Sequence, residues 1–418
     1  IDLVHRWKDR AWRLDANLIW SQVRGSEQAI ERTQRSFEHL FQRPDATHLG
    51  VDTTLTQLSG TGGTISIGEF DGDWIFQAGM TYRAPGLELN DIGFLTNTDQ
   101  INFYAWGARR WRNPTKLFNR FQWNQNIYAG WDFAGNSLNR SYNTNVWGQL
   151  KTFQNFNWFL NLEQQDISKN ALRGGPLFRR PPGWATGGGI GTDYRKRFNA
   201  FLFFNGGRSY DGNVMGGSVG IEFSYQPIDA LSLSFQPSLN LTEREDQYFD
   251  TQQDGDRMGY LHGHIKQQTL SLTLRGTYNI TPDFTIQYYA QPFVARGIYD
   301  NFKIVDNPLA KSFDDRFYTF PLESITFDSD DNLFSVNDDA DEDVDFAFRD
   351  PDFNFVQFRS NLVIRWEYRM GSTLFFVWQQ GTEGGVDPKQ NVFSTLPDLF
   401  GNDIRNTFLV KATYRFVR

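Results

Sequence analysis

Residues 231–242, with the sequence LSLSFQPSLNLT, alternate apolar and polar side chains at nearly every position. In an extended chain successive side chains point to opposite faces, so the leucines and the phenylalanine of this segment share one face. The intervening serines, glutamine and asparagine share the other. The segment therefore predicts a β-strand with one apolar face and one polar face.

The same alternation returns in the second half of the chain, and there the polar face is also charged. In residues 356–369 it carries Arg359, Arg365, Glu367 and Arg369. An ordinary β-sandwich would not bury such a face, whereas the interior of a membrane barrel is polar. The pattern favours a barrel. The other alternating segments are 270–280, 284–293, 373–380 and 405–418.

Applied to the whole chain, this pattern predicts about 17 strands. Bacterial barrels usually have an even number, so we expect an all-β, antiparallel transmembrane β-barrel with about 16–18 strands in residues 1–418. An odd count also suggests further strands upstream. The strands expected before residue 231 are 1–7, 11–23, 60–71, 73–83, 101–111, 117–132, 140–152, 156–167, 184–194, 198–207 and 213–226.

Composition agrees with this fold class and excludes several others. Aromatic residues make up 16% of a chain whose mean hydropathy is negative, and a barrel uses aromatic rings at both membrane interfaces. No run of 18 apolar residues is present, so a transmembrane helix is not expected. The net charge of −8 disfavours a general nucleic-acid binder. The absence of Cys excludes disulfide scaffolds and thiolate metal sites.

The connections alternate between short and long, as outer-membrane topology requires. We assign the short ones to the periplasm and the long ones to the cell exterior. Within the first long loop, residues 26–41 predict a helix capped by Ser26 and stopped before Pro44, with Ile30, Phe37 and Phe41 on one face. The long connections are 24–59, 84–100, 168–183, 244–258, 301–355 and 381–404.

Both ends of the chain carry information. The sequence begins at Ile1 without a signal peptide, so we expect that a natural N-terminal portion precedes it. At the other end, Phe408, Val410, Ala412, Tyr414 and Phe416 would share one face of a closing strand. By analogy with other barrels, an outer-membrane assembly machine would read that strand.

Several segments go beyond general barrel features and together resemble one family. This is a large Bacteroidota-type outer-membrane family of unknown function. Its members carry an N-terminal domain similar to family-9 carbohydrate-binding modules ahead of a C-terminal barrel. The resemblance implies that residues 1–418 are the barrel part of a longer protein, and it brings no activity that can be carried over. The segments are DLVHRW (2–7), VRGSEQAIERTQRS (23–36), FQRPDATHL (41–49), RAPGLELNDIGF (83–94), NALRGGP (170–176) and FRSNLVIRWEYRMGSTLFFVWQQG (358–381).

The sharpest local feature is an acidic segment, residues 328–352, which contains eleven Asp or Glu residues. Asp339, Asp341, Asp343 and Asp345 follow one another at a spacing of two. Carboxylates at this spacing can converge on Ca²⁺, although the EF-hand positions for Gly and Glu do not match. The alternative is a solvated acidic loop that holds no metal. No other cofactor is expected.

Three further constellations are weaker. Residues 85–95 predict a structured turn whose apolar side chains tuck into the barrel mouth. The basic segment 172–183 is expected to be a rigid loop, with lipopolysaccharide phosphates as an alternative ligand. His262 and His264 have the spacing of some zinc ligands, but no third ligand can be named. Catalytic motifs such as a nucleophile elbow or HExxH are absent, so we do not expect an enzyme.

Three functions remain open at this point. The first is a plugged or gated, porin-like pore in a Gram-negative outer membrane, which transports or binds solutes or glycans. The second is a structural or scaffold subunit of an outer-membrane complex, with partner lipoproteins bound by the long loops. The third is a barrel enzyme acting on glycans or lipids. In each case the chain contacts outer-membrane lipid or lipopolysaccharide, and no nucleic acid.

Overall fold

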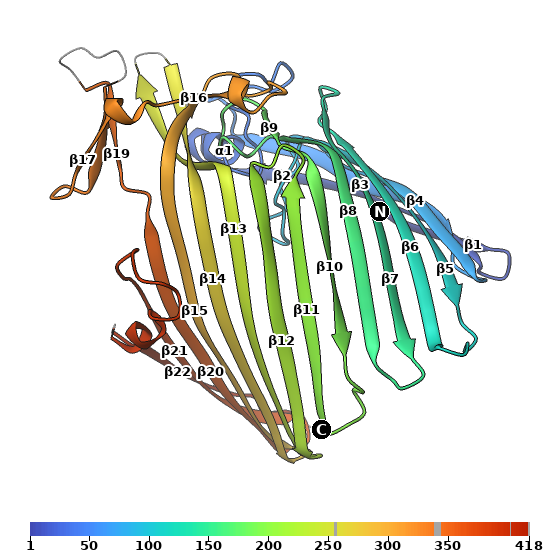
Figure 1. Cartoon of the computed structure of the whole chain (residues 1–418). Helices are drawn as coiled ribbons and strands as arrows, with labels where there is room; N and C mark the ends of the chain where they lie inside the picture. The colour runs from blue at the N-terminus through green and yellow to red at the C-terminus, as the bar shows by residue number, and fades with distance from the viewer. Residues whose placement is uncertain (255–256, 338–343, 402, 417–418) are drawn as a thin grey trace.

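The computed structural model describes residues 1–254, 257–337, 344–401 and 403–416. In this part of the chain the fold is all-β, with one nineteen-stranded sheet, a separate three-stranded sheet and one α-helix (Figure 1). None of the described helices is long and apolar enough to cross a membrane.

The first half of the large sheet follows the strands expected from the alternation. Helix α1 (Glu27–Gln34) lies in the connection between the second and third strands. The strands are β1 (Asp2–Trp7), β2 (Trp12–Arg24), β3 (Gln57–Glu69), β4 (Trp74–Arg83), β5 (Gln100–Trp111), β6 (Phe118–Trp131), β7 (Ser137–Leu150), β8 (Asn155–Ser168), β9 (Phe178–Arg180), β10 (Gly183–Gly191) and β11 (Phe198–Ser209).

The second half contains the longest strands and the small sheet β17–β19. Short 3-10 helices are η1 (Asp314–Arg316), η2 (Leu322–Ser324) and η3 (Leu396–Phe400). The strands are β12 (Val214–Ile228), β13 (Leu231–Asp254), β14 (Arg257–Thr281), β15 (Phe284–Val305), β16 (Phe317–Thr319), β17 (Ile325–Asp328), β18 (Leu333–Val336), β19 (Phe346–Arg349), β20 (Phe353–Arg369), β21 (Ser372–Gly385) and β22 (Arg405–Ala412).

Every pairing in the large sheet is antiparallel. The short strands β9 and β16 pair only with β8 and β15. The remaining seventeen strands run from β1 to β22 as a single meander.

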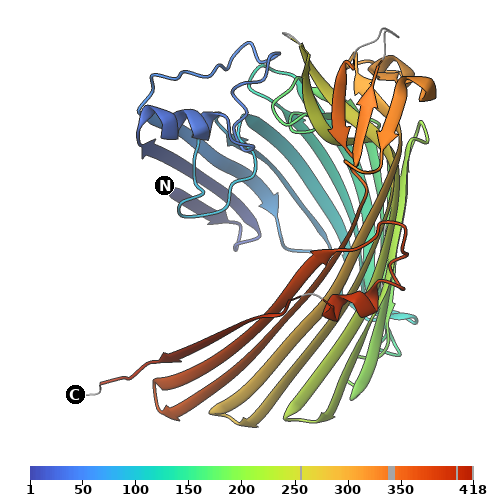
Figure 2. The ribbon, with the colours of Figure 1, turned by 90° about the vertical axis from the view of Figure 1, so that its left-hand side faces the viewer.

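The expected closed barrel is not found in the described residues. β1 pairs with β2 alone and β22 with β21 alone, and the two edges stand apart in Figure 2. With an odd number of strands, the first and the last run in the same direction. Antiparallel pairing between these edges is therefore impossible, because a closed antiparallel barrel needs an even number of strands.

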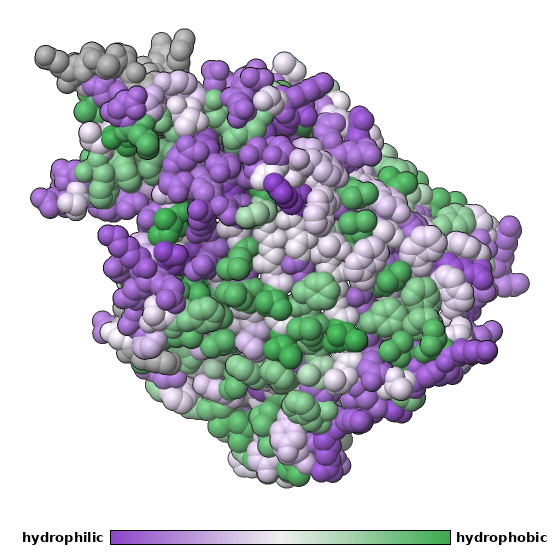
Figure 3. Space-filling model, in the orientation of Figure 1, coloured by the Kyte–Doolittle hydropathy of each residue, from purple (hydrophilic) through white to green (hydrophobic). Residues whose placement is uncertain are grey.

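The two faces of the sheet differ in the way that the alternation predicts. Trp366 and Phe408 are among the apolar side chains that stay exposed on one face, at 49% and 62%. Figure 3 shows the convex side of the sheet, where apolar residues form a broad area below a polar upper surface. A continuous apolar area of this kind is uncommon on a protein surrounded by water.

Most connections separate by length onto two rims, as expected, although 132–136 and 210–213 at the long-loop rim are as short as turns at the other rim. Short turns join β1 to β2, β3 to β4, β12 to β13, β14 to β15 and β20 to β21 at one rim, and long loops gather at the other (Figure 1).

The prediction of long loops at 244–258 and 301–355 is partly wrong. Residues 244–258 were expected to be a loop, yet β13 continues to Asp254 and β14 begins at Arg257. Similarly, β15 continues to Val305, and the rest of 301–355 holds β16 to β19. The ladder persists because its backbone hydrogen bonds do not require an apolar face.

Helix α1 begins as predicted and ends early. The Ser26 hydroxyl accepts a hydrogen bond from the Ala29 amide at 3.3 Å. The helix stops at Gln34 instead of residue 41, since the chain turns at Arg35 and Leu40 has a left-handed φ of 54°. Ile30 and Phe41 are buried, but Phe37 is 51% exposed, so the expected shared face of the three is wrong.

Candidate functional site

At the long-loop rim, four connections meet beside the polar face of the sheet: residues 25–56, 84–99, 132–136 and 169–177. The first is held by an apolar cluster of Ile30, Phe41 and Leu58. It is also held by Gln34, which is fully buried. The Gln34 side chain donates to the Asp52 carbonyl and accepts from the Asp52 amide, both at 2.8 Å.

The second connection crosses directly over β3. Leu87 is 1% exposed, and a Cβ atom on Gly60 would lie 2.2 Å from the Leu87 nitrogen. Glycine in β3 is therefore what permits this close approach. The expectation that residues 85–95 tuck into the mouth is confirmed for Leu87 and Leu95 and wrong for Ile92 and Phe94, which are about nine-tenths exposed.

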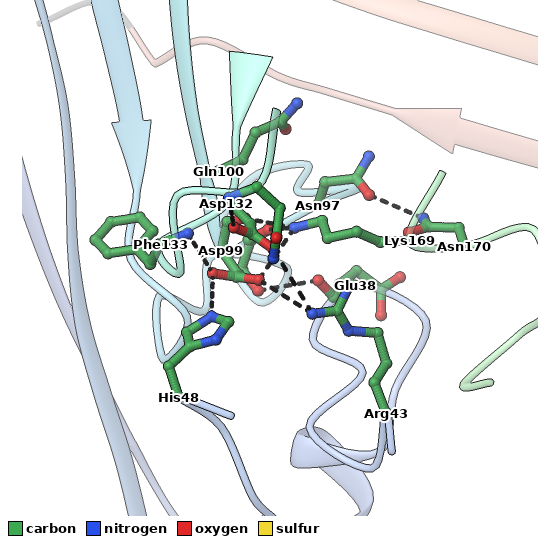
Figure 4. Close-up of polar contacts among 12 residues, drawn as sticks. Glu38, Arg43, His48, Asn97, Asp99, Gln100, Asp132, Phe133, Lys169 and Asn170 are labelled. Atoms are coloured by element: carbon green, nitrogen blue, oxygen red, sulfur yellow. Dashed lines mark hydrogen bonds and ion pairs between the residues drawn. The ribbon is translucent and has the colours of Figure 1, made fainter. Parts of the chain in front are cut away.

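A buried ionic network, which we call the rim clamp, joins all four connections (Figure 4). Its centre is Asp99, which is 1% exposed and has a left-handed φ of 51°. One Asp99 carboxylate oxygen accepts from His48 Nε2 at 2.8 Å and from the Phe133 amide at 3.0 Å. The other lies 3.5 Å from Lys169 Nζ.

Two cations and two carboxylates balance the charge of the rim clamp. Arg43 Nη2 lies 3.9 Å from carboxylate oxygens of both Asp99 and Asp132. Asn136 in turn donates to Asp132 through its backbone and side-chain nitrogens, both at 2.8 Å. Lys169 donates to the Thr98 carbonyl at 2.7 Å. Because these charges are out of water, losing one partner leaves another uncompensated.

Burial sets the electrostatics of the rim clamp. It lowers the pKa of the Lys169 ammonium, and the nearby Asp99 carboxylate acts in the opposite direction. The Asp99 carboxylate oxygens lie against His48, Lys169, Arg43 and the Phe133 amide, and the Asp132 oxygens against Asn136 and Arg43. Such an arrangement holds loops in place and does not resemble a proton-transfer site. No motif in the sequence predicted the rim clamp, because its members come from four separate connections between residues 43 and 169.

The polar face of β6, β7 and β8 forms a ladder of amides. Asn124 donates to Asn145 at 2.7 Å, Asn126 donates to Asn143 at 2.7 Å, and Asn143 donates to Asn161 at 2.5 Å. Next to the ladder is a pocket of about 400 Å³. Tyr104, Tyr128, Asn102, Asn139, Glu163 and Gln165 are among its lining residues. This wall offers donors and acceptors to polar solutes.

The two histidines of the pair have different surroundings. His262 is 1% exposed and its ring packs against Phe178 and Phe317, with centroids 5.4 and 5.2 Å away. The two ring nitrogens of His264 face Asp300 at 2.6 Å and Glu243 at 3.0 Å. Among the described residues, no group of three His, Cys, Asp or Glu side chains is placed to hold a metal ion.

Only one of the four predicted calcium ligands lies in the part of the chain that the structure describes. Asp339, Asp341 and Asp343 lie outside the described residues. Asp345 is exposed, and its backbone amide donates to the Val336 carbonyl at 3.0 Å. Calcium binding at these four residues stays a prediction.

The basic segment 172–183 is largely engaged with the protein itself. The Arg173 guanidinium lies 5.0 Å from the ring centre of Tyr248, and Arg179 Nε donates to the Leu309 carbonyl at 3.0 Å. Leu172 and Phe178 are buried against Phe317. These contacts agree with the rigid-loop interpretation, and a lipopolysaccharide ligand stays a prediction.

Comparison with known proteins gives a family without an activity. A family model described as a domain of unknown function, DUF5916, matches residues 32–417. No curated protein matches the chain. Among solved structures, a bacterial polysaccharide outer membrane secretin is similar over 78% of this chain and 88% of its own, with 10% identity and a TM-score of 0.33. A likeness this weak carries no argument about function.

Proposed function

Because the chain belongs to the DUF5916 family, whose function is unknown, we propose a function from the chemistry of the two faces of its sheet. The protein is an outer-membrane β-barrel wall that encloses a path for polar solutes, and its own loops plug that path at the extracellular rim. The membrane we propose is that of a Gram-negative bacterium of the Bacteroidota type. The proposal involves binding and passage without a chemical step.

The observation that carries the proposal is the contrast between the faces within single strands. In β20, Leu362, Ile364 and Trp366 point to one side, and Arg359, Asn361 and Arg365 to the other. Hydrocarbon stabilises the first set and water the second, so lipid outside and a wet lumen inside satisfy both. A soluble sheet with the same faces would leave an apolar surface in water.

The rim clamp supports the plugged state. It ties the loop that contains α1 to the connections after β4, β6 and β8, so the loop cannot move freely away from the mouth. Breaking a buried ion pair by removing one partner costs roughly 3–5 kcal/mol. A plug held in this way opens only when the network is disrupted.

The test is conductance of the purified protein in planar bilayers, first as wild type and then as Asp99→Asn. We expect small or rare currents from wild type and larger or more frequent ones from the variant. Arg35→Gln is the matched control, because Arg35 pairs with Glu31 on the exposed side of the same loop helix. That variant should conduct like wild type.

A second candidate, a scaffold subunit, is favoured by one observation. The small sheet β17–β19 stands beside the tips of β13–β15 at the long-loop rim, where a partner could reach it (Figures 1 and 2). Protein that inserts into bilayers but never conducts, in wild type or variant, would argue against the pore and direct attention to co-purifying partners.

A further inference from the structure

The last four strands of the sheet carry two cross-strand rows on the polar face. One row is Tyr289, Asn361, Gln379 and Thr407, from β15, β20, β21 and β22. The second row lies two residues away on each strand, on the same side of the first row. Its members are Gln291, Arg359, Gly381 and Arg405.

Gly381 leaves a slot between two arginines. It pairs with Arg359 on one side and with Arg405 on the other, so the two arginine backbones are about 9.6 Å apart, twice the strand spacing. A Cβ atom on Gly381 would meet nothing nearer than the Phe358 carbonyl oxygen at 4.0 Å. Both guanidinium groups can therefore reach over the same empty position.

Neither arginine side chain has a polar partner among the described residues. Arg359 and Arg405 are exposed, and among the described residues neither makes an ion pair or a side-chain hydrogen bond. Arg365 on the same face of β20 behaves differently, because it pairs with Glu367 at 2.6 Å. Two guanidinium groups without a protein partner among the described residues therefore flank one slot.

Arg359, Gly381 and Arg405 line a pocket of about 1060 Å³. Beside the arginines, Asn361, Gln379 and Thr407 supply amide and hydroxyl groups, and Tyr289 supplies a ring. Two carboxylates also line it, and neither is paired with an arginine: Glu383 accepts from Gln357 at 3.0 Å, and Asp403 lies in the loop before β22.

We propose that this pocket, the arginine slot, binds the oxyanion of a small polar solute. Guanidinium groups bind planar or tetrahedral oxyanions through paired, charge-assisted hydrogen bonds, which Lys cannot reproduce. The amides and the hydroxyl of the neighbouring row then contact the uncharged part of the solute. The inference rests on the proposed function in one respect, since a solute reaches this face through the lumen.

Calorimetric titration of the detergent-solubilised chain tests the proposal with four probes. Phosphate and sulfate represent inorganic oxyanions, glucuronate represents a sugar carboxylate, and glucose is the neutral control. We expect saturable binding of at least one oxyanion and none of glucose. Preference for glucuronate would assign a sugar-acid ligand, and preference for phosphate or sulfate an inorganic or esterified one.

Two kinds of variant separate the slot from general charge effects. Arg359→Gln and Arg405→Gln should each weaken binding at least tenfold. Gly381→Leu should abolish binding without changing any charge, because its side chain fills the slot. The matched controls are Gly385→Leu, on the same face of β21 with nothing within 4 Å, and Arg369→Gln, at the short-turn end of β20.

The proposal is overturned if no oxyanion binds saturably, or if the slot variants bind as the control variants do. Since titration in detergent needs no open pore, its result is independent of conductance. Binding without current in either wild type or Asp99→Asn would keep the arginine slot and remove the pore. Current without binding would keep the pore and remove the slot. If Gly381→Leu fails to fold, the two arginine variants still decide the question.

Discussion

At the scale of single residues, a few buried polar groups hold the loops of the long-loop rim together. Asp99 alone contacts residues from three other connections, and it does so from a left-handed backbone conformation that costs a non-glycine residue energy. The surrounding contacts must offset that cost. Removal of such a residue is expected to release several loops together.

His39 provides a pH-dependent counterpart. Its ring is buried, and Nε2 donates to the Leu87 carbonyl at 3.2 Å, which leaves Nδ1 to accept from the Ser36 hydroxyl at 3.2 Å. Burial lowers the pKa of His39 below its usual 6.5, although Glu88 and Glu38 oppose this. The neutral ring therefore stabilises the docked loop above about pH 6.5, and this stability is lost as the pH falls through that value toward the lowered pKa.

Hydrogen exchange measures this effect directly. After correction for intrinsic rates, amides of residues 36–46 should exchange faster at pH 5.5 than at pH 7.5. In His39→Gln, which cannot titrate, the difference between the two pH values should largely disappear. Equal protection at both pH values in wild type would contradict the assignment, as would an unchanged pH response in the variant.

At the scale of elements, the sequence predicted the strands well wherever an apolar face alternates with a polar one. Residues 231–242, 270–280 and 284–293 all fall within observed strands. The upper parts of β13, β14 and β15 were missed because apolar and polar residues no longer alternate strictly there, and register shifts interrupt the pairing of β13 with β14 and of β14 with β15. Strands β17 to β19 were missed because four residues are too few to show a period.

The candidate sites were less predictable for a physical reason. The rim clamp takes one to three residues from each of four connections, and only the fold brings them together. The arginine slot was half visible, because the polar face of 356–369 was evident from the alternation. Its other half depends on the register that places Gly381 between Arg359 and Arg405, and register is set by pairing that the sequence of one strand does not contain.

The last long loop covers part of the apolar face. Leu239, Leu270, Val294 and Val356 form one cross-strand row, and Val392 and Leu399 of the loop pack on it. This explains why Leu270 is 5% exposed while Leu274, on the same face of β14, is 43% exposed. A loop expected only to extend outward therefore also shields the sheet.

Leu399→Ala should detach this loop. Truncating a buried leucine costs about 2–5 kcal/mol, and Leu399 is 1% exposed. Limited proteolysis should then cut residues 386–401 much faster than in wild type. Phe393→Ala is the control, because Phe393 is in the same loop and 60% exposed. Equal cleavage of the two variants would show that the apolar contact does not hold the loop.

At the scale of the whole molecule, the apolar faces of neighbouring strands lie on the same side of the sheet. Neighbouring strands run in opposite directions, and their register pairs apolar residues with apolar residues. The apolar faces therefore combine into a broad surface, part of which is seen in Figure 3. The edges at β1 and β22 limit this surface in the described residues. In the proposed function, the hydrocarbon of a membrane covers this surface.

Adjacent residues in the middle of β13 test this arrangement. Phe235 is 39% exposed and pairs with Phe223 and Leu274, so it belongs to the apolar face, whereas Gln236 pairs with Thr273 on the polar face. An arginine facing lipid near the midplane costs roughly 2–4 kcal/mol, so Phe235→Arg should greatly reduce insertion into liposomes. Gln236→Arg should insert like wild type, since its charge meets water. Flotation of proteoliposomes measures the inserted fraction, and equal flotation of both variants would mean that the convex face does not contact lipid.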